Sequence, residues 1–282
     1  MTAARALVLG GGGVAGIAWE IGLLAGLAEH GVDVRDADLV IGTSAGSIVG
    51  TFLRGDTPLA ELYQRQAAPV PSAEPTPQFD GTAMMAAFAT ALAGATGEQD
   101  ARARVGALAL AARTAPEEER KAIIAARIGS PPWPAARLVV TAVDTADGAF
   151  RAFDADSGVP LVDAVAARCA VPGVWPPVTV HGRRFMDGGM RSVTNADLAA
   201  GSGQVLVVAP MRGFPNSPLG PDLDTEADLL RRDGKVHVVV ADEASVQAFG
   251  TNPLAPATRQ PSALAGRAQA EAVWREIADF WS

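Results

Sequence analysis

The sequence predicts an α/β domain built around a parallel sheet. Two short apolar runs, residues 6–9 and 39–41, are each followed by a glycine-containing turn and then by a helical pattern. This order of strand, loop and helix is typical of parallel sheets, in which helices connect the strands. The chain has 282 residues, 49% of them hydrophobic and 19% charged, so it can bury the core of one large domain.

The first two helices are predicted at residues 14–30 and 45–53. In the first, apolar side chains recur every three to four residues, and Gly31 follows as a helix stop. The second begins at the turn that follows the strand at 39–41 and ends at a polar segment around Gly55.

Residues 56–134 interrupt this alternation and are predicted to form a helical insertion or cap. A proline-rich stretch at 69–78 opens the helical part. Three helical segments follow it, near residues 81–93, 99–113 and 116–128. The first of them carries an apolar stripe of Met84, Met85, Phe88 and Leu92. Such a stripe indicates core packing more often than the wall of an acyl-chain site or a lid, which stays the alternative.

The sheet pattern resumes after residue 136 and continues towards the C-terminus. A helix is predicted at residues 161–170. The predicted strands are residues 137–143, 149–153, 178–180, 184–186, 204–209 and 235–240. The last predicted element is an amphipathic helix at residues 262–280. Its inward positions are predicted to be Leu264, Ala268, Val273, Ile277 and Phe280.

Charge and composition narrow the classes of partner. The net charge is −8 and no cluster of Lys and Arg interrupts the acidic pattern, so nucleic acid is not expected as a partner. An acidic surface also disfavours electrostatic docking on anionic lipid, which leaves only transient apolar contact with a membrane surface open. No stretch reaches the ~20 apolar residues of a membrane-spanning helix, so we expect a cytoplasmic protein that is at most peripheral to a membrane.

The single cysteine, Cys169, excludes an intramolecular disulfide and a cysteine-based zinc site. It lies in an apolar run and is predicted to be a small buried residue. The three histidines, His30, His181 and His237, are scattered, so no metal site and no cofactor are expected.

The pentapeptide GTSAG at residues 42–46 is the strongest chemical signal. It matches the G-x-S-x-G turn between a strand and a helix, in which the central serine is exposed as a nucleophile. The turn also brings the N–H groups that follow Ser44 to a helix N-terminus, where they can hold a developing oxyanion. Glycines are expected on both sides of the serine because a Cβ there would clash in so tight a turn.

Two further motifs fit acyl transfer. The glycine loop at residues 10–16 offers several backbone N–H groups between a strand and a helix. Asp187 ends a predicted hairpin strand and precedes two glycines, so its carboxylate can approach another loop and act as a base. The glycine loop also fits G-x-G-x-x-G, but dinucleotide binding would need an acidic residue at the end of the second strand, where residues 42–44 stand instead.

Together with residues 170–178 (AVPGVWPPV), these motifs resemble the patatin-like phospholipase family in order and separation. The resemblance covers residues 4–195, which we expect to form the catalytic domain, with the helical insertion at about 56–134. Residues 196–282 are expected to complete the same domain. The resemblance implies a three-layer α/β/α fold with a mostly parallel central sheet. It also implies a lipid or ester substrate, lipid acyl hydrolase activity, and a Ser–Asp dyad without a cofactor.

Transferred by motif, Ser44 is the nucleophile and Asp187 the base. The N–H groups of Gly11, Gly12, Gly13 and Ala45 are the expected oxyanion donors. The glycines that support the motifs are Gly16, Gly42, Gly46, Gly188 and Gly189. One departure concerns Ala15, where the family often has Arg or Lys. The missing positive charge weakens the expectation of a phosphate-bearing substrate, and neutral esters or lipids stay possible substrates.

Two alternatives remain at this point. His237 follows Asp187 in the chain and would complete a Ser–Asp–His triad of the α/β-hydrolase type. It lies within a predicted strand rather than in a loop after one, which favours the dyad. The second alternative is a catalytically silent lipid-binding protein with the patatin fold. The acyl length, the head group and the oligomeric state are not specified by the sequence.

Overall fold

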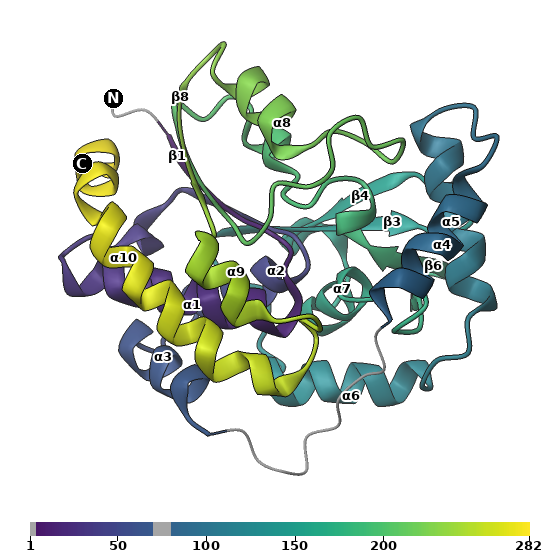
Figure 1. Ribbon diagram of the computed structural model, residues 1–282, viewed down its shortest axis with the longest axis horizontal. Helices are drawn as coiled ribbons and strands as arrows, with labels where there is room; N and C mark the ends of the chain where they lie inside the picture. The colour runs from purple at the N-terminus through teal and green to yellow at the C-terminus, as the bar shows by residue number, and fades with distance from the viewer. Residues whose placement is uncertain (1–3, 70–79) are drawn as a thin grey trace.

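A computed structural model describes residues 4–69 and 80–282, so the predicted interruption at 69–78 lies, apart from Pro69, outside the described residues. Figure 1 shows a central sheet between two layers of helices, the three-layer α/β/α arrangement. The strands are β1 (Arg5–Leu9), β2 (Leu39–Gly42), β3 (Arg137–Asp144), β4 (Phe150–Phe153), β5 (Val178–Val180), β6 (Arg183–Asp187), β7 (Gln204–Ala209) and β8 (Lys235–Val240).

The sheet order is β5-β6-β3-β2-β1-β7-β8, with β4 paired to β3. The central run from β3 through β2, β1 and β7 to β8 is parallel, while β4, β5 and β6 join it antiparallel. The predicted mostly parallel sheet is therefore confirmed. Because β7 pairs with β1 and β8 with β7, the C-terminal part of the chain extends the same sheet.

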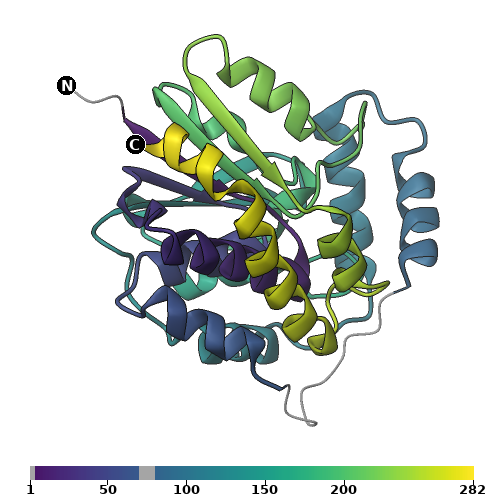
Figure 2. The ribbon, with the colours of Figure 1, turned by 60° about the vertical axis from the view of Figure 1, so that its left-hand side comes forward.

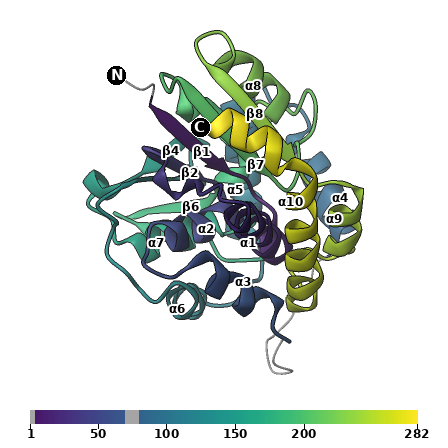
Figure 3. The ribbon, with the colours of Figure 1, turned by 90° about the vertical axis from the view of Figure 1, so that its left-hand side faces the viewer.

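Helices cover both faces of the sheet (Figures 2 and 3). The helices are α1 (Gly13–Glu29), α2 (Ala45–Leu53), α3 (Leu59–Ala67), α4 (Gly81–Leu92), α5 (Glu98–Ala111), α6 (Glu117–Ile128), α7 (Leu161–Arg168), α8 (Leu223–Leu230), α9 (Glu243–Phe249) and α10 (Arg259–Trp281). One face packs against α1, α2, α7 and α10 in the larger core, and the other is covered by α8 and the short turn Ala196–Ala199. No helix in residues 4–69 or 80–282 is both long and apolar enough to cross a membrane.

The C-terminal helix turns only part of the predicted face inward: Ile277 is buried, and Val273 and Phe280 pack against the larger core. Leu264 is 50% exposed and Ala268 is also exposed, whereas Gly266 and Ala270 are buried against α1. A Cβ on Gly266 would lie 2.2 Å from the carbonyl oxygen of Trp19, so the two helices touch through their backbones. The prediction for Leu264 and Ala268 was wrong because so close an approach selects small residues rather than large apolar ones.

The segment between α2 and β3 contains the helices α3 to α6. Its first helix had not been predicted, and neither had α8 and α9. The residues of the apolar stripe on α4 differ in their exposure. Met85 is exposed, whereas Phe88 and Leu92 pack on the small core formed by α5, β3 and β6. Helix α6 takes a separate course and lies beneath α2 and α7 in Figure 1, on the face of the sheet that carries α1.

Candidate active site

Ser44 occupies a sharp turn between β2 and α2. Its backbone has φ 50° and ψ −113°, a left-handed conformation that side chains other than glycine rarely adopt. The flanking glycines make room for this turn. A Cβ on Gly46 would lie 2.2 Å from the Leu9 carbonyl oxygen, and one on Gly42 would lie 2.5 Å from that of Gly46. The turn is therefore built from backbone contacts that exclude a single extra carbon atom.

The register of the sheet brings Asp187 level with this turn. Gly42 pairs with Val140 on β3, and Asp187 pairs with Ala142, two residues further along the same strand. The Ser44 hydroxyl Oγ donates a hydrogen bond to Oδ2 of Asp187 at 2.7 Å. The other carboxylate oxygen, Oδ1, accepts the N–H of Gly189 at 2.7 Å. Ser44 and Asp187 are thus in contact, and the N–H of Gly189 holds the carboxylate in place.

Asp187 is almost completely enclosed, with 2% of its surface exposed. Burial raises the pKa of its carboxyl group above the ordinary value, because the charged form loses its hydration. The hydrogen bonds from Ser44 and Gly189 lower that pKa in part. The positive charges of Arg168 and Arg120 act in the same direction. A carboxylate with a raised pKa is a stronger base than an exposed one.

Arg168, on α7, is fully buried behind the turn. Its Nη2 donates a hydrogen bond to the carbonyl oxygen of Gly42. Burial lowers the pKa of Arg168 to about 10, so the guanidinium stays charged near pH 7. Glu20, on α1, is also fully buried, and burial raises the pKa of its carboxyl group well above the ordinary value. Sequence reasoning missed both residues; the signal was a charged side chain inside each of two apolar runs.

The glycine loop lies between β1 and α1, next to the serine turn. The N–H of Gly11 donates to the carbonyl oxygen of Val193 at 2.7 Å, so it is engaged within the protein. For the N–H groups of Gly12, Gly13 and Ala45, residues 4–69 and 80–282 provide no acceptor. Gly13 and Ala45 both line the cavity that contains Ser44. These two are the first residues of α1 and α2, so their N–H groups lie at helix N-termini.

A buried polar network ties the serine turn to the loop after Asp187. The Thr43 hydroxyl donates to the carbonyl oxygen of Thr194 at 3.0 Å, and it accepts a hydrogen bond from Nδ2 of Asn195 at 3.0 Å. Asn195 is fully buried and has φ 50°, and its amide also donates to the carbonyl oxygen of Ser192 at 2.8 Å. This network was not predicted, because its members become neighbours only when β2 and the later loop meet.

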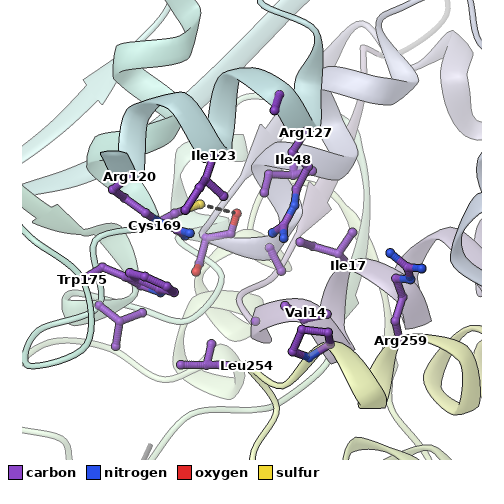
Figure 4. Close-up of a pocket in the computed structure, with 16 residues that line it drawn as sticks. Val14, Ile17, Ile48, Arg120, Ile123, Arg127, Cys169, Trp175, Leu254 and Arg259 are labelled. Carbon is purple, nitrogen blue, oxygen red and sulfur yellow. Dashed lines mark hydrogen bonds between the residues drawn. The ribbon is translucent and has the colours of Figure 1, made fainter. Parts of the chain in front are cut away.

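Ser44 opens into a cavity of about 450 Å³, which Figure 4 shows in close-up. One wall is formed by the start of α1 and α2, with Val14, Ile17 and Ile48. The opposite wall is a face of α6 with Arg120, Ile123 and Arg127. Trp175, Leu254 and Arg259 also line the cavity. The cavity combines a mostly apolar surface with cationic side chains and is large enough for part of a lipid-like molecule.

Cys169 and His237 are two other side chains that the sequence offered for catalysis. Cys169 is buried and faces the carbonyl oxygen of Ser44, and burial raises the pKa of its thiol. His237 lies within β8, which β1 and β7 separate from β2, at roughly 4.8 Å per strand. Its ring lies 5.4 Å from that of Phe280 on α10. Within the described ranges, no group of three or more His, Cys, Asp or Glu could hold a metal ion.

Comparison with solved structures gives distant similarities. The chain aligns with the crystal structure of VipD from Legionella pneumophila at a TM-score of 0.46 and 11% identity, covering 96% of this chain and 66% of VipD. It aligns with the type III effector protein ExoU at a TM-score of 0.41 and 16% identity, covering 98% of this chain and 53% of ExoU. The chain therefore spans about two thirds and about half of these two proteins. No curated protein sequence matches it.

The family model described as patatin-like phospholipase matches residues 7–200, which include the glycine loop, Ser44 and Asp187. The match covers more than half of the chain and agrees with the resemblance seen in the motifs. The chain belongs to the patatin-like phospholipase family.

Proposed function

We propose that the protein is a serine acyl hydrolase that cleaves carboxylic ester bonds of lipids through a covalent acyl-enzyme. Ser44 is the nucleophile and Asp187 is the only side-chain base. The observation that carries the proposal is the hydrogen bond of 2.7 Å from Ser44 Oγ to Asp187 Oδ2, at the edge of a cavity of about 450 Å³. Family membership supports the class of reaction.

In the first half of the reaction, Asp187 takes the proton of the Ser44 hydroxyl as Oγ attacks the ester carbonyl carbon. The carbonyl oxygen becomes an oxyanion. It is bound by the N–H groups of Gly12, Gly13 and Ala45, since that of Gly11 already donates to Val193. One such donor is typically worth about 3–4 kcal/mol of transition-state stabilisation. The tetrahedral adduct then collapses, and the leaving alcohol receives the proton from Asp187.

In the second half, a water molecule replaces the alcohol. Asp187 removes a proton from this water as its oxygen attacks the acyl carbon of the Ser44 ester. Collapse of the second adduct breaks the bond to Oγ, which takes the proton back from Asp187, and the carboxylic acid leaves. No histidine is needed, because the same carboxylate acts as base and as acid in both halves.

The test uses p-nitrophenyl butyrate and a fluorophosphonate probe on the purified protein. Ser44→Ala and Asp187→Asn should each lower kcat by about a thousandfold or more, since both act in one step. The probe should add one label to the wild type and none to Ser44→Ala, as measured by intact mass. Asp187→Asn preserves the shape of the side chain. A loss of activity in this variant would therefore show the need for a proton acceptor rather than a change in packing.

His237→Ala is the matched control, since it tests the triad that the sequence left open. It should keep kcat within about threefold of the wild type, because His237 lies in the middle of β8, against Phe280. If His237→Ala loses activity as Ser44→Ala does, the dyad is wrong. If the wild type neither turns over esters nor reacts with the probe, the protein is a lipid-binding member of the family.

A further inference from the structure

We propose that the substrate carries a negatively charged oxygen group, a phosphate or a carboxylate, which Arg120 binds with help from Arg127 and Arg259. This inference rests on the proposed ester hydrolysis and names the chemical class of the ester. It concerns the side of the cavity formed by α6 and the start of α10, where Arg120 lies over the ring of Trp175.

The described lining of the cavity carries side chains of the charge opposite to the net charge of the chain. The chain has a net charge of −8, yet the described residues lining the cavity include three arginines and no carboxylate. Arg120, Ile123 and Arg127 follow one another on one face of α6, at helical spacings of three and four residues. In Figure 4 the side chains of Arg120 and Arg127 enter the cavity on either side of Ile123, and Arg259 lies across from Arg120.

Arg120 is the most deeply buried of the three arginines. Its side chain is 6% exposed, and its guanidinium carbon lies 3.9 Å from the centre of the Trp175 ring. Among the residues that the structure describes, Arg120 forms no ion pair, and its Nε has no hydrogen-bond partner. Burial lowers the pKa of Arg120 to about 10, so the group remains a cation near pH 7.

No carboxylate of the described residues lies within ion-pair distance of Arg120, and Asp187 acts on its charge only from further away. A buried cation in such a place is costly unless something closer supplies the opposite charge. Trp175 offers the face of its ring, which offsets part of that cost and fixes the plane of the guanidinium. The remaining N–H groups line the space beside Ser44. An anionic oxygen group on the substrate would satisfy them with charge-assisted hydrogen bonds. The arrangement therefore fits a substrate that brings its own negative charge.

The glycine loop contributes no such charge. Ala15 is fully buried, and its N–H donates to the carbonyl oxygen of Pro253 at 2.9 Å. A long cationic side chain at this position would have to displace packed residues. In this protein the positive charge around the cavity comes instead from α6 and α10, so the absence of Arg or Lys at position 15 does not argue against an anionic substrate.

The two sources of negative charge differ in where they join the ester. A phosphate would belong to the leaving alcohol, as in a lysophospholipid, and a carboxylate would belong to the acyl group, as in the monoester of a dicarboxylic acid. Two matched pairs separate them. Lauroyl-lysophosphatidic acid is compared with monolauroylglycerol, and mono-p-nitrophenyl adipate is compared with p-nitrophenyl hexanoate, all below the concentrations at which they aggregate.

In at least one pair, the wild type should have a kcat/KM about tenfold higher or more for the anionic member, as expected for a charge-assisted contact. Arg120→Gln should lower this ratio by about tenfold, and Arg127→Gln by about threefold, since its side chain is only half-buried. Arg232→Gln removes one positive charge from an exposed turn outside the cavity and should leave the ratio unchanged. If Arg120→Gln does not fold, the kcat/KM ratio of the wild type and its change in Arg127→Gln still test the inference.

The outcomes are distinct. A preference within the phosphate pair assigns the arginines to the alcohol side, and one within the adipate pair assigns them to the acyl side. If neither anionic ester is preferred while the neutral esters are hydrolysed, the inference is overturned and the proposed function stands. An equal loss on both members of a pair in Arg120→Gln also overturns it, since the arginine would then act only through Asp187. Absence of all turnover and of probe labelling would refute the proposed function itself.

Discussion

The two walls of the cavity are held by different kinds of structure. The wall that carries Ser44 consists of turns between strands and helices, in which backbone atoms touch one another and a single Cβ would lie 2.2 Å from a carbonyl oxygen. The opposite wall is one face of α6, where Arg120, Ile123 and Arg127 point into the cavity. Backbone geometry therefore fixes the position of Ser44, the proposed nucleophile. Exchangeable side chains on a helix of the insertion shape what can enter.

The first experiment adds one carbon atom to the wall that carries Ser44, which we call the rigid wall. Gly46→Ala places a Cβ against the Leu9 carbonyl oxygen, and neither backbone atom can move without shifting β1 or α2. Replacing a helical glycine with alanine gains at most about 1 kcal/mol from helix propensity. Overpacking against backbone should cost about 3 kcal/mol or more, so the free energy of unfolding should fall and esterase activity should disappear. Chemical denaturation measures the first effect.

Gly55→Ala is the matched control for this prediction. It lies just beyond the end of α2, and its Cβ would have ordinary contacts, the nearest being the Phe52 carbonyl oxygen at 3.5 Å. We expect a change within about 0.5 kcal/mol, since the backbone there is compatible with alanine. A Gly46→Ala protein that is as stable and as active as Gly55→Ala would contradict the rigid wall.

The second experiment enlarges a side chain on the α6 wall. Ile123→Trp should fill part of the cavity, because Ile123 lines it. Long acyl chains should lose space, so the ratio of kcat/KM for p-nitrophenyl laurate to that for p-nitrophenyl acetate should fall about tenfold or more. Glu118→Trp, on the solvent side of the same helix with 85% of its side chain exposed, should leave the ratio as in the wild type. A parallel loss for both esters would mean that α6 also fixes the catalytic geometry.

The same contrast explains what the sequence could predict. Strands 204–209 and 235–240 were predicted with the correct bounds, because buried parallel strands are short apolar runs bounded by turn residues. The approach of Ser44 to Asp187 was predictable because each motif ends a strand and carries its own glycines. These features depend on residues close together in the sequence. A turn that tolerates only glycine can be recognised from its glycines, independently of the tertiary packing around it.

Features that depend on tertiary packing were not predictable in this way. Leu264 was expected to face inward, since apolar periodicity cannot show that α1 approaches α10 through Gly266 and excludes large side chains. The arginines of α6 resemble a solvent-exposed face until the insertion is placed beside Ser44. The short helices α8 and α9 were missed although Asp222 and Asp242 cap them, and each cap was a readable signal.

A third experiment tests whether the rigid wall also sets the basicity of Asp187. The pKa of Asp187 is raised by burial and lowered in part by the positive charge of Arg168, which also holds the Gly42 carbonyl oxygen. The base must be ionised to accept the serine proton, so kcat/KM should fall as the pH drops through this raised pKa. Arg168→Met keeps much of the length but removes the charge. The pKa of Asp187 should rise further, and the acid limb of the pH profile should move to higher pH.

The control for this shift is another buried arginine that binds backbone carbonyl groups. Arg102, on α5, donates to the carbonyl oxygens of Gly148 at 2.8 Å and Leu219 at 2.5 Å, and it has no part in the pKa of Asp187. Arg102→Met should reduce stability in a similar way but leave the acid limb where it is. If both variants have the wild-type limb, the basicity of Asp187 is set by burial alone and Arg168 serves only to hold the turn. If the limb of Arg168→Met moves to lower pH, the group that titrates is not Asp187, and the proposed base would have to be sought elsewhere.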